Sequence, residues 1–137
     1  MPSKTLSTPQ PALPEMSLKI FIIGSYFGET TGEIQKNINR AQQAGIELMK
    51  KGHLPLVPQS MYAWWEHEIQ KPLIMKTIFD WIRNSDAVFV LNLGAEGSGT
   101  AQAVDVAMES GLVIFTDLDE IPQLPAKTSN PTTSPFF

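Results

Sequence analysis

Long apolar runs constrain the fold of this chain more than any other feature of its sequence. Leu18–Gly24 and Ala87–Leu93 consist mostly of Ile, Val, Leu and Phe, and the shorter Leu112–Thr116 continues the pattern. A strand with one face in water would alternate apolar and polar residues, whereas these runs are typical of strands buried on both faces of a parallel sheet. His53–Pro58 contains two prolines, which predicts an edge strand, where a missing amide donor costs least.

Between these strands, apolar residues recur at three- and four-residue steps, the period of an amphipathic helix. Thr31 precedes the first such stripe, Ile34–Leu48, and Gly52 follows it as a stop signal, as Gly111 does for the last helix. Three further helical segments are predicted at Met61–Glu68, Leu73–Asn84 and Thr100–Ser110. This alternation predicts an α/β fold, a three-layer sandwich with a parallel, Rossmann-like or flavodoxin-like sheet of about four to five strands.

The two ends of the chain differ in composition from its centre. Residues 1–17 and 125–137 are rich in Pro, Ser and Thr, so they offer too little apolar surface to offset the entropy of ordering. We therefore expect a disordered N-terminal tail over 1–17, one folded domain over 18–124 and a disordered C-terminal tail over 125–137.

Charge and composition narrow the classes of partner. The formal net charge is −4 and no basic run occurs, so duplex nucleic acid is not an expected partner. The chain has no cysteine, which excludes disulfides and thiolate metal sites. No apolar stretch approaches the ~20 residues that span a bilayer, and no secretory signal is recognisable. These features predict a cytoplasmic protein without membrane contact.

Two loops at the carboxyl ends of predicted strands are candidates for ligand binding, because open parallel sheets bind ligands there. The first runs from Gly94 to Thr100 and contains Gly97, Ser98 and Gly99. It leads into a helix N-terminus, whose free N–H groups suit a phosphate or a sugar hydroxyl. A plain flexible connection is the alternative interpretation.

The other loop follows the first strand and contributes Gly24, Ser25, Tyr26 and Phe27. Its aromatic rings could stack a base while the hydroxyl holds a phosphate, or they could simply cover the end of the sheet. Neither loop is a dinucleotide or Walker A motif, because Gln102 stands where a third glycine is needed and no lysine follows the glycines. We therefore assign no cofactor and no metal ion.

An aromatic and acidic cluster begins at Trp64 and Trp65. These side chains could form a lid that stacks a base, or they could pack on the sheet or on a partner subunit. His67, beside them, is either an acid–base group or a surface residue. His53 is interpreted as a surface histidine and Asp86 as the cap of a turn.

Five short motifs share one order and spacing over residues 18–116: Lys19–Tyr26 (KIFIIGSY), Asn37–Ala41 (NINRA), Gly52–Pro58 (GHLPLVP), Ser85–Val88 (SDAV) and Ser98–Ala101 (SGTA). Together they resemble the nucleoside 2-deoxyribosyltransferase-like superfamily. The resemblance implies a pocket at the strand ends that holds a nucleoside or its 5′-phosphate. In active members of that superfamily a Glu two residues after the last motif attacks the sugar C1′, forming a glycosyl-enzyme.

This sequence departs from the family pattern at the residues that carry the chemistry. Ala103 occupies the position of the nucleophilic Glu, and Ile78 stands where active members often have an acidic residue. We therefore expect a nucleoside- or nucleotide-binding protein that lacks the usual nucleophile. The alternative is an active N-glycosidase or deoxyribosyltransferase that uses a relocated carboxylate, Asp80 or Glu96.

A second alternative is a partner-binding module without enzymatic activity. In this interpretation Trp64 and Trp65 face another chain, which could be a further copy of the protein in a homo-oligomer. The missing Glu is compatible with binding to either a nucleotide or a protein, whereas the glycine-rich loop favours a small-molecule ligand.

Overall fold

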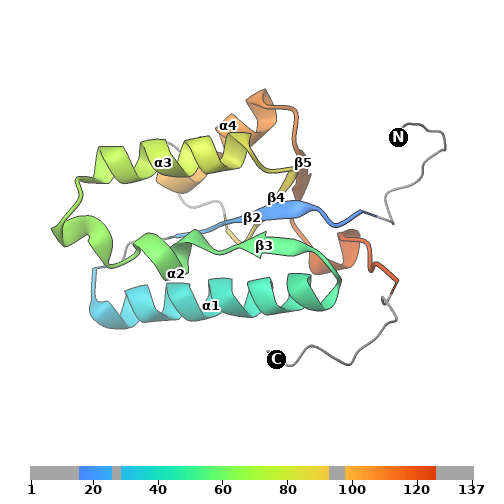
Figure 1. Cartoon of the computed structure of the whole chain (residues 1–137). Coiled ribbons are helices and arrows are strands. Elements are labelled where there is room, and N and C mark those ends of the chain that lie inside the picture. Colours follow the sequence, from blue (N-terminus) through green and yellow to red (C-terminus); the bar gives the residue numbers. More distant parts are fainter. Residues whose placement is uncertain (1–15, 26–28, 93–97, 126–137) are drawn as a thin grey trace, which may run out of the picture.

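The computed structural model describes residues 16–25, 29–92 and 98–125. Within these residues the sheet has four strands, all parallel, in the order β3-β2-β4-β5 (Figure 1). The strands are β2 (Lys19–Ile23), β3 (Leu54–Leu56), β4 (Ala87–Val90) and β5 (Val113–Phe115). The proline-containing segment is confirmed as an edge strand, since β3 lies at the end of the sheet beside β2.

Helices cover both faces of the sheet. They are α1 (Thr31–Lys50), α2 (Pro58–Tyr62), α3 (Lys71–Arg83) and α4 (Gly99–Glu109), with 3₁₀ turns η2 (Trp65–His67) and η3 (Leu118–Glu120). In Figure 1, α1 lies below the sheet and α3 and α4 lie above it. The predicted α/β three-layer sandwich is confirmed. Across the described residues, no helix combines the length and the apolar character needed to cross a membrane.

The two faces of the sheet carry separate apolar clusters. Phe21 and Ile23 of β2 pack with Ile78 and the other core residues of α3 and α4. The alternate residues of β2, Ile20 and Ile22, belong to the cluster under α1. Because side chains of a strand alternate between faces, β2 must be apolar throughout to fill both clusters, which is why its sequence is an uninterrupted run.

The strand order reverses beside β2. The chain passes from β2 through α1 to β3 on one side, and then crosses back so that β4 lies on the other side of β2. Ile23 pairs with Val90 at the last position of both strands. The carboxyl ends of β2 and β4 therefore meet at the topological switch point, the place where ligands of such sheets bind.

The ends of α1 and α4 follow the predicted signals with small shifts, whereas the predicted helix Met61–Glu68 is wrong, because α2 covers Pro58–Tyr62 and a separate 3₁₀ turn, η2, covers Trp65–His67. Gly52 and Gly111 have φ of 97° and 73°, the left-handed region that favours glycine, and each follows the capping residue of a helix. Thr31 is the first residue of α1 rather than its cap, because the hydroxyl of Thr30 accepts the N–H of Glu33.

The expectation of a surface histidine at position 53 is wrong. His53 is buried, its Nδ1 accepts the N–H of Leu18 at 3.1 Å, and its Nε2 lies 2.7 Å from the carbonyl oxygen of Pro122. Nε2 therefore carries the proton and donates it to that carbonyl. Asp86 also differs from expectation, because its carboxylate accepts the N–H of Lys19 on the neighbouring strand at 2.8 Å instead of capping its own turn.

Candidate functional site

A cavity of about 850 Å³ lies between α3 and α4 and reaches the carboxyl end of β2. It is lined by Ser25, Lys71, Pro72, Met75, Lys76, Phe79, Asp80, Arg83, Ser98, Gly99, Thr100 and Gln102. The structure thus brings together Ser25, from one predicted loop, and Ser98 to Thr100, from the other. They meet because both follow strands that end at the switch point.

Ser98 is the N-cap of helix α4 and lines the cavity. Its side chain accepts the N–H of Ala101 at 3.2 Å, so part of its role is to cap the helix. Thr100, in the first turn, is buried. The first turn of an α-helix directs N–H groups and a partial positive charge outward, and this end of the cavity therefore favours an anionic group.

Gly99, the first residue of α4, lies close to the side chain of Met75. A Cβ atom at this position would lie 3.0 Å from the methyl carbon of Met75 on α3. Its φ is not among the positive values of the described glycines, which occur at Gly52 and Gly111. Gly99 thus contacts the flexible end of the Met75 side chain and also lines the cavity.

The floor of the cavity is apolar and is formed by one side of α3. Pro72, Met75 and Phe79 recur at three- and four-residue steps, so they share one side of the helix. This side differs from the core stripe, which contains Ile74, Ile78 and Ile82. An apolar floor of this kind can pack against a flat ring such as a nucleobase.

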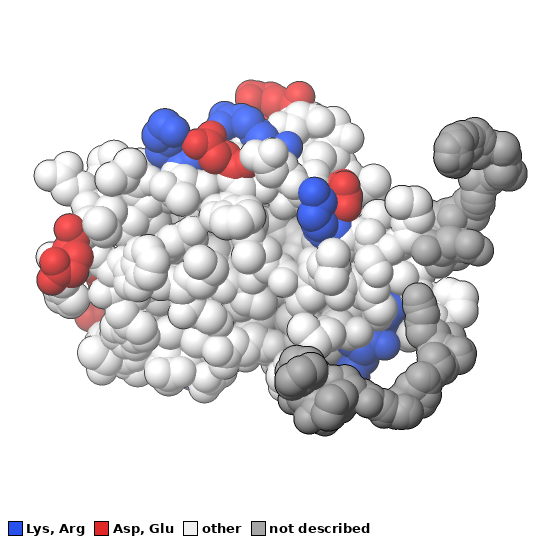
Figure 2. All heavy atoms as spheres, viewed as in Figure 1, with Lys and Arg blue, Asp and Glu red and all other residues white. Residues whose placement is uncertain are grey.

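The charged groups of the cavity are mostly basic. Lys71, Lys76 and Arg83 line it together with one acid, Asp80. Asp80 bonds to Lys76 at 2.9 Å and to Arg83 at 3.0 Å. Figure 2 shows basic and acidic side chains interspersed along the margin formed by α3. A locally basic cavity in a chain of net charge −4 favours an anionic ligand over a cationic one.

Asp80 is held in its ionised form. The hydrogen bond from Lys76, assisted by the positive charges of Lys76 and Arg83, lowers the pKa of the Asp80 carboxyl below its ordinary value. This candidate for a relocated catalytic carboxylate does line the cavity. Because its pKa is lowered, Asp80 cannot donate a proton near neutral pH. It could therefore act in catalysis only as an ionised carboxylate.

The two positions where the family pattern expects acids belong to the core. Ile78 is fully buried and Ala103 is 4% exposed, and both lie in the apolar cluster between the sheet and the helices α3 and α4. Neither lines the cavity. A carboxylate at either position would lose its hydration on folding, at a cost of several kcal/mol unless it were paired.

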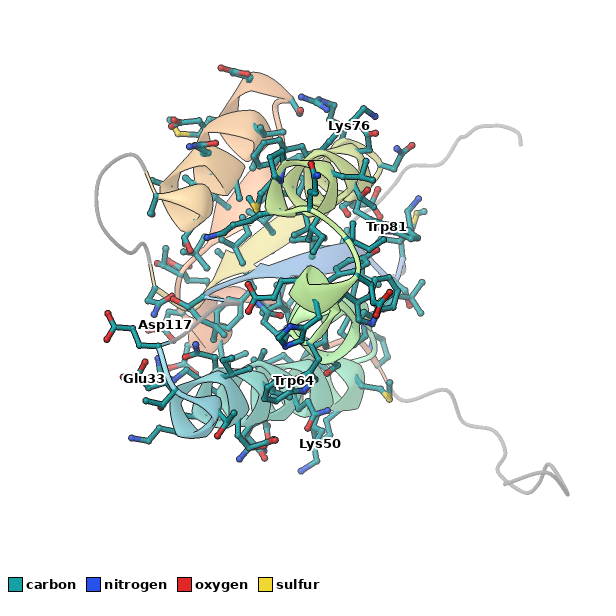
Figure 3. All side chains as sticks on the ribbon, turned by 90° about the vertical axis from the view of Figure 1, so that its left-hand side faces the viewer. Glu33, Lys50, Trp64, Lys76, Trp81 and Asp117 are labelled. Atoms are coloured by element: carbon teal, nitrogen blue, oxygen red, sulfur yellow. The ribbon has the colours of Figure 1, made fainter. Side chains whose placement is uncertain are left out.

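Three other predicted site residues that the structure describes, Gly24, Trp64 and Trp65, do not line this cavity. Gly24 packs closely against Leu91, the residue after β4, because a Cβ atom at position 24 would lie 3.1 Å from the Cδ1 atom of Leu91. Trp64 and Trp65 are 42% and 46% exposed and do not line the cavity. Figure 3 shows Trp64 near α1 and Lys76 on the other side of the sheet. Five predicted residues lie outside the described part of the chain: Tyr26, Phe27, Gly94, Glu96 and Gly97.

Several site residues were missed by sequence reasoning. Lys71, Met75 and Phe79 lie on the side of α3 that faces the cavity, and only their helical spacing could have signalled a shared face. Gln59 does not line the cavity, but it is 1% exposed and its Nε2 donates to the carbonyl oxygens of Ile22 and Gly24, both at 3.3 Å. It fastens α2 to the carboxyl end of β2.

Two buried side-chain oxygens near the switch point have no hydrogen-bond partner among the described residues. They are Oε1 of Gln59 and Oδ1 of Asn92. The amide nitrogen of Gln59 faces the carbonyl groups of Ile22 and Gly24, which can only accept, so its oxygen points away from them. Among the residues that the structure describes, no three His, Asp or Glu side chains group as metal ligands do.

Comparison with known proteins supplies no assignment. No protein-family model matches the chain, and no curated protein is significantly similar to it. The resemblance to the deoxyribosyltransferase-like superfamily therefore rests on the five short motifs alone.

Proposed function

We propose that the protein binds a nucleoside 5′-phosphate or a closely similar nucleotide in the cavity between α3 and α4, and that it does not transfer the glycosyl group. The single observation that carries the proposal is the composition of this cavity. Hydroxyl side chains at a helix start, an apolar floor on α3 and three basic side chains surround one space at the switch point. Such a lining matches the phosphate, base and sugar of a nucleotide.

The size of the cavity agrees with this ligand class. Small-molecule sites occupy about 300–1,000 Å³, and the cavity measures about 850 Å³. In the proposed pose, the phosphate lies near Lys71 and the first turn of α4. The base then packs over Met75 and Phe79. The excess of basic groups explains why a nucleotide should bind better than the uncharged nucleoside.

A first experiment tests the position of the phosphate. Lys71→Met should weaken the binding of deoxyadenosine 5′-monophosphate about tenfold, which corresponds to about 1.4 kcal/mol for a lost charge-assisted contact. Binding of deoxyadenosine should change little. Isothermal titration calorimetry measures both. The matched control is Lys36→Met on α1, an exposed lysine that does not line the cavity, and this variant should bind the nucleotide like the parent.

If neither ligand binds the parent protein, the nucleotide proposal fails. If both bind but Lys71→Met has the affinity of the parent for the nucleotide, the phosphate lies elsewhere. Equal losses in the two lysine variants would mean that net charge, and not a specific contact, determines the affinity.

A second experiment tests the absence of glycosyl transfer. Incubation of the protein with deoxynucleotides should release no base above background, because the usual nucleophile is replaced by buried Ala103. Liquid chromatography of the products measures the release. Steady release that disappears in Asp80→Asn would support the rival enzyme, since Asp80 lines the cavity as a stable carboxylate. Release that persists in Asp80→Asn but disappears in Glu96→Gln would assign the other candidate carboxylate.

A further inference from the structure

The two ends of the cavity between α3 and α4 differ in their polar groups. An α-helix rises about 1.5 Å per residue, so the lining residues Lys71 and Arg83, at the first and last positions of α3, lie about 18 Å apart along its axis. The start of α4 lies near the first of these ends, because Gly99 lies close to the side chain of Met75. With the phosphate at that end, as proposed above, a base over Phe79 directs its Watson–Crick edge toward the other end.

The second end of the cavity contains one carboxylate between two cations. Asp80 accepts a hydrogen bond from Lys76 at its Oδ2 atom and from Arg83 at its Oδ1 atom. A carboxylate has about four acceptor positions, so Asp80 can accept further hydrogen bonds from a ligand while both ion pairs remain. All three side chains line the cavity and are at least half exposed, and a ligand in the cavity can therefore reach them.

This arrangement of charges does not suit a second phosphate group. The carboxylate of Asp80 would repel a phosphate, and its charge offsets that of one of the two cations. Because the pKa of Asp80 is lowered, its carboxylate accepts hydrogen bonds near neutral pH and donates none. The ligand group that matches this end therefore has N–H donors for Asp80 and, beside them, an acceptor for Lys76 or Arg83.

Among the four bases of DNA, guanine alone has this pattern on its Watson–Crick edge. It carries two adjacent donors, the ring N–H and the 2-amino group, and next to them the O6 acceptor. Adenine and cytosine have a ring nitrogen that only accepts beside a single amino group, and this nitrogen would face the lone pairs of a carboxylate. Thymine has one N–H between two carbonyl oxygens. Guanine is therefore the base that can satisfy a carboxylate and a cation together.

We propose that the base of the bound nucleotide is guanine and that Asp80 is the residue that selects it. The carboxylate accepts the ring N–H and the 2-amino group, and Arg83 or Lys76 donates to O6. This inference rests on the proposed nucleotide site and adds the identity of the base. A site built to hydrogen-bond a ligand group discriminates against ligands that lack it, because the polar atoms of the site are then left without that partner.

Isothermal titration calorimetry of the full chain with three deoxynucleoside 5′-monophosphates tests this proposal. The guanine nucleotide should bind about tenfold more tightly than the hypoxanthine nucleotide, which lacks only the 2-amino group, and at least about tenfold more tightly than the adenine nucleotide. In Asp80→Ala the ratio of the guanine to the hypoxanthine affinity should fall to about one. Because these two ligands carry the same charge, the change in the charge of the protein cancels from the ratio.

The matched control is Glu47→Ala on α1. Glu47 is also an exposed carboxylate that pairs with a lysine of its own helix, Lys50, but it does not line the cavity. This variant should keep the affinity ratio of about ten. Exposed ion pairs contribute little to stability, so thermal melting should show that both variants are folded.

The possible results separate the identity of the base from the nucleotide site itself. A parent protein that binds the adenine nucleotide as tightly as the guanine nucleotide overturns the assignment of guanine and leaves the nucleotide site standing. A ratio that persists in folded Asp80→Ala, or that falls equally in Glu47→Ala, overturns the role of Asp80, because another group would then recognise the 2-amino group. If the parent binds none of the three nucleotides, the proposed function fails, and the choice of base fails with it.

Discussion

His53→Ala is expected to lower the free energy of unfolding by about 2–3 kcal/mol. The imidazole accepts the N–H of Leu18 and donates to the carbonyl of Pro122, and it is 3% exposed. Its removal leaves both backbone groups without their partner and leaves a cavity between the entry to β2 and the segment after η3. Urea denaturation followed by far-UV circular dichroism measures the change.

His53→Gln is the matched control. Glutamine carries one acceptor and one donor, so it can replace part of the bridge, and its loss should be smaller than that of alanine. A stability of His53→Ala equal to that of the parent would show that Leu18 and Pro122 find other partners.

Gly52→Ala is expected to cost about 3 kcal/mol, from two additive causes. The residue has φ of 97°, a conformation in which an L side chain is strained. The new Cβ atom would also lie 2.9 Å from the Cβ atom of Leu124, so the segment that follows η3 would have to move. Leu124 is held there by its N–H, which donates to the carbonyl of Lys51 at 2.9 Å.

Gly111→Ala separates the two causes. Gly111 has a similar φ of 73°, but a Cβ atom there would meet no other atom within 4 Å. Its substitution should cost only the backbone term, about 1 kcal/mol. Denaturant unfolding of both variants gives the difference. Equal losses at the two glycines would contradict the contact between residue 52 and Leu124.

Much of the candidate site could be inferred from parallel-sheet geometry. Ser25 and Ser98 are far apart in sequence, yet each follows a strand at the switch point, and both line the cavity. The basic and apolar residues of α3 were not foreseen. Their place in the cavity depends on the packing of α3 beside α4, two helices that share one apolar core cluster. No local pattern in the chain encodes which two helices become neighbours.

The aromatic residues illustrate the same limit. Spacing alone left open whether Trp64 and Trp65 cover a ligand, pack on the sheet or face another chain. The structure shows Trp65 against Tyr62, and Tyr62 hydrogen-bonded to Trp81, about twenty residues further along the chain. Trp65 and Trp81 are half exposed because of the path by which α2 and η2 connect β3 to α3.

By itself, the sequence determined the α/β class, the doubly buried strands and the glycines that end α1 and α4. These features depend on local conformation and on burial summed along each element, and both can be seen in consecutive residues. Only the tertiary structure decided that His53 is buried, that Asp80 is paired with two basic residues and that one cavity joins α3 to α4. The physical reason is that burial and pairing depend on partners from elsewhere in the fold, and their positions are set by packing between elements.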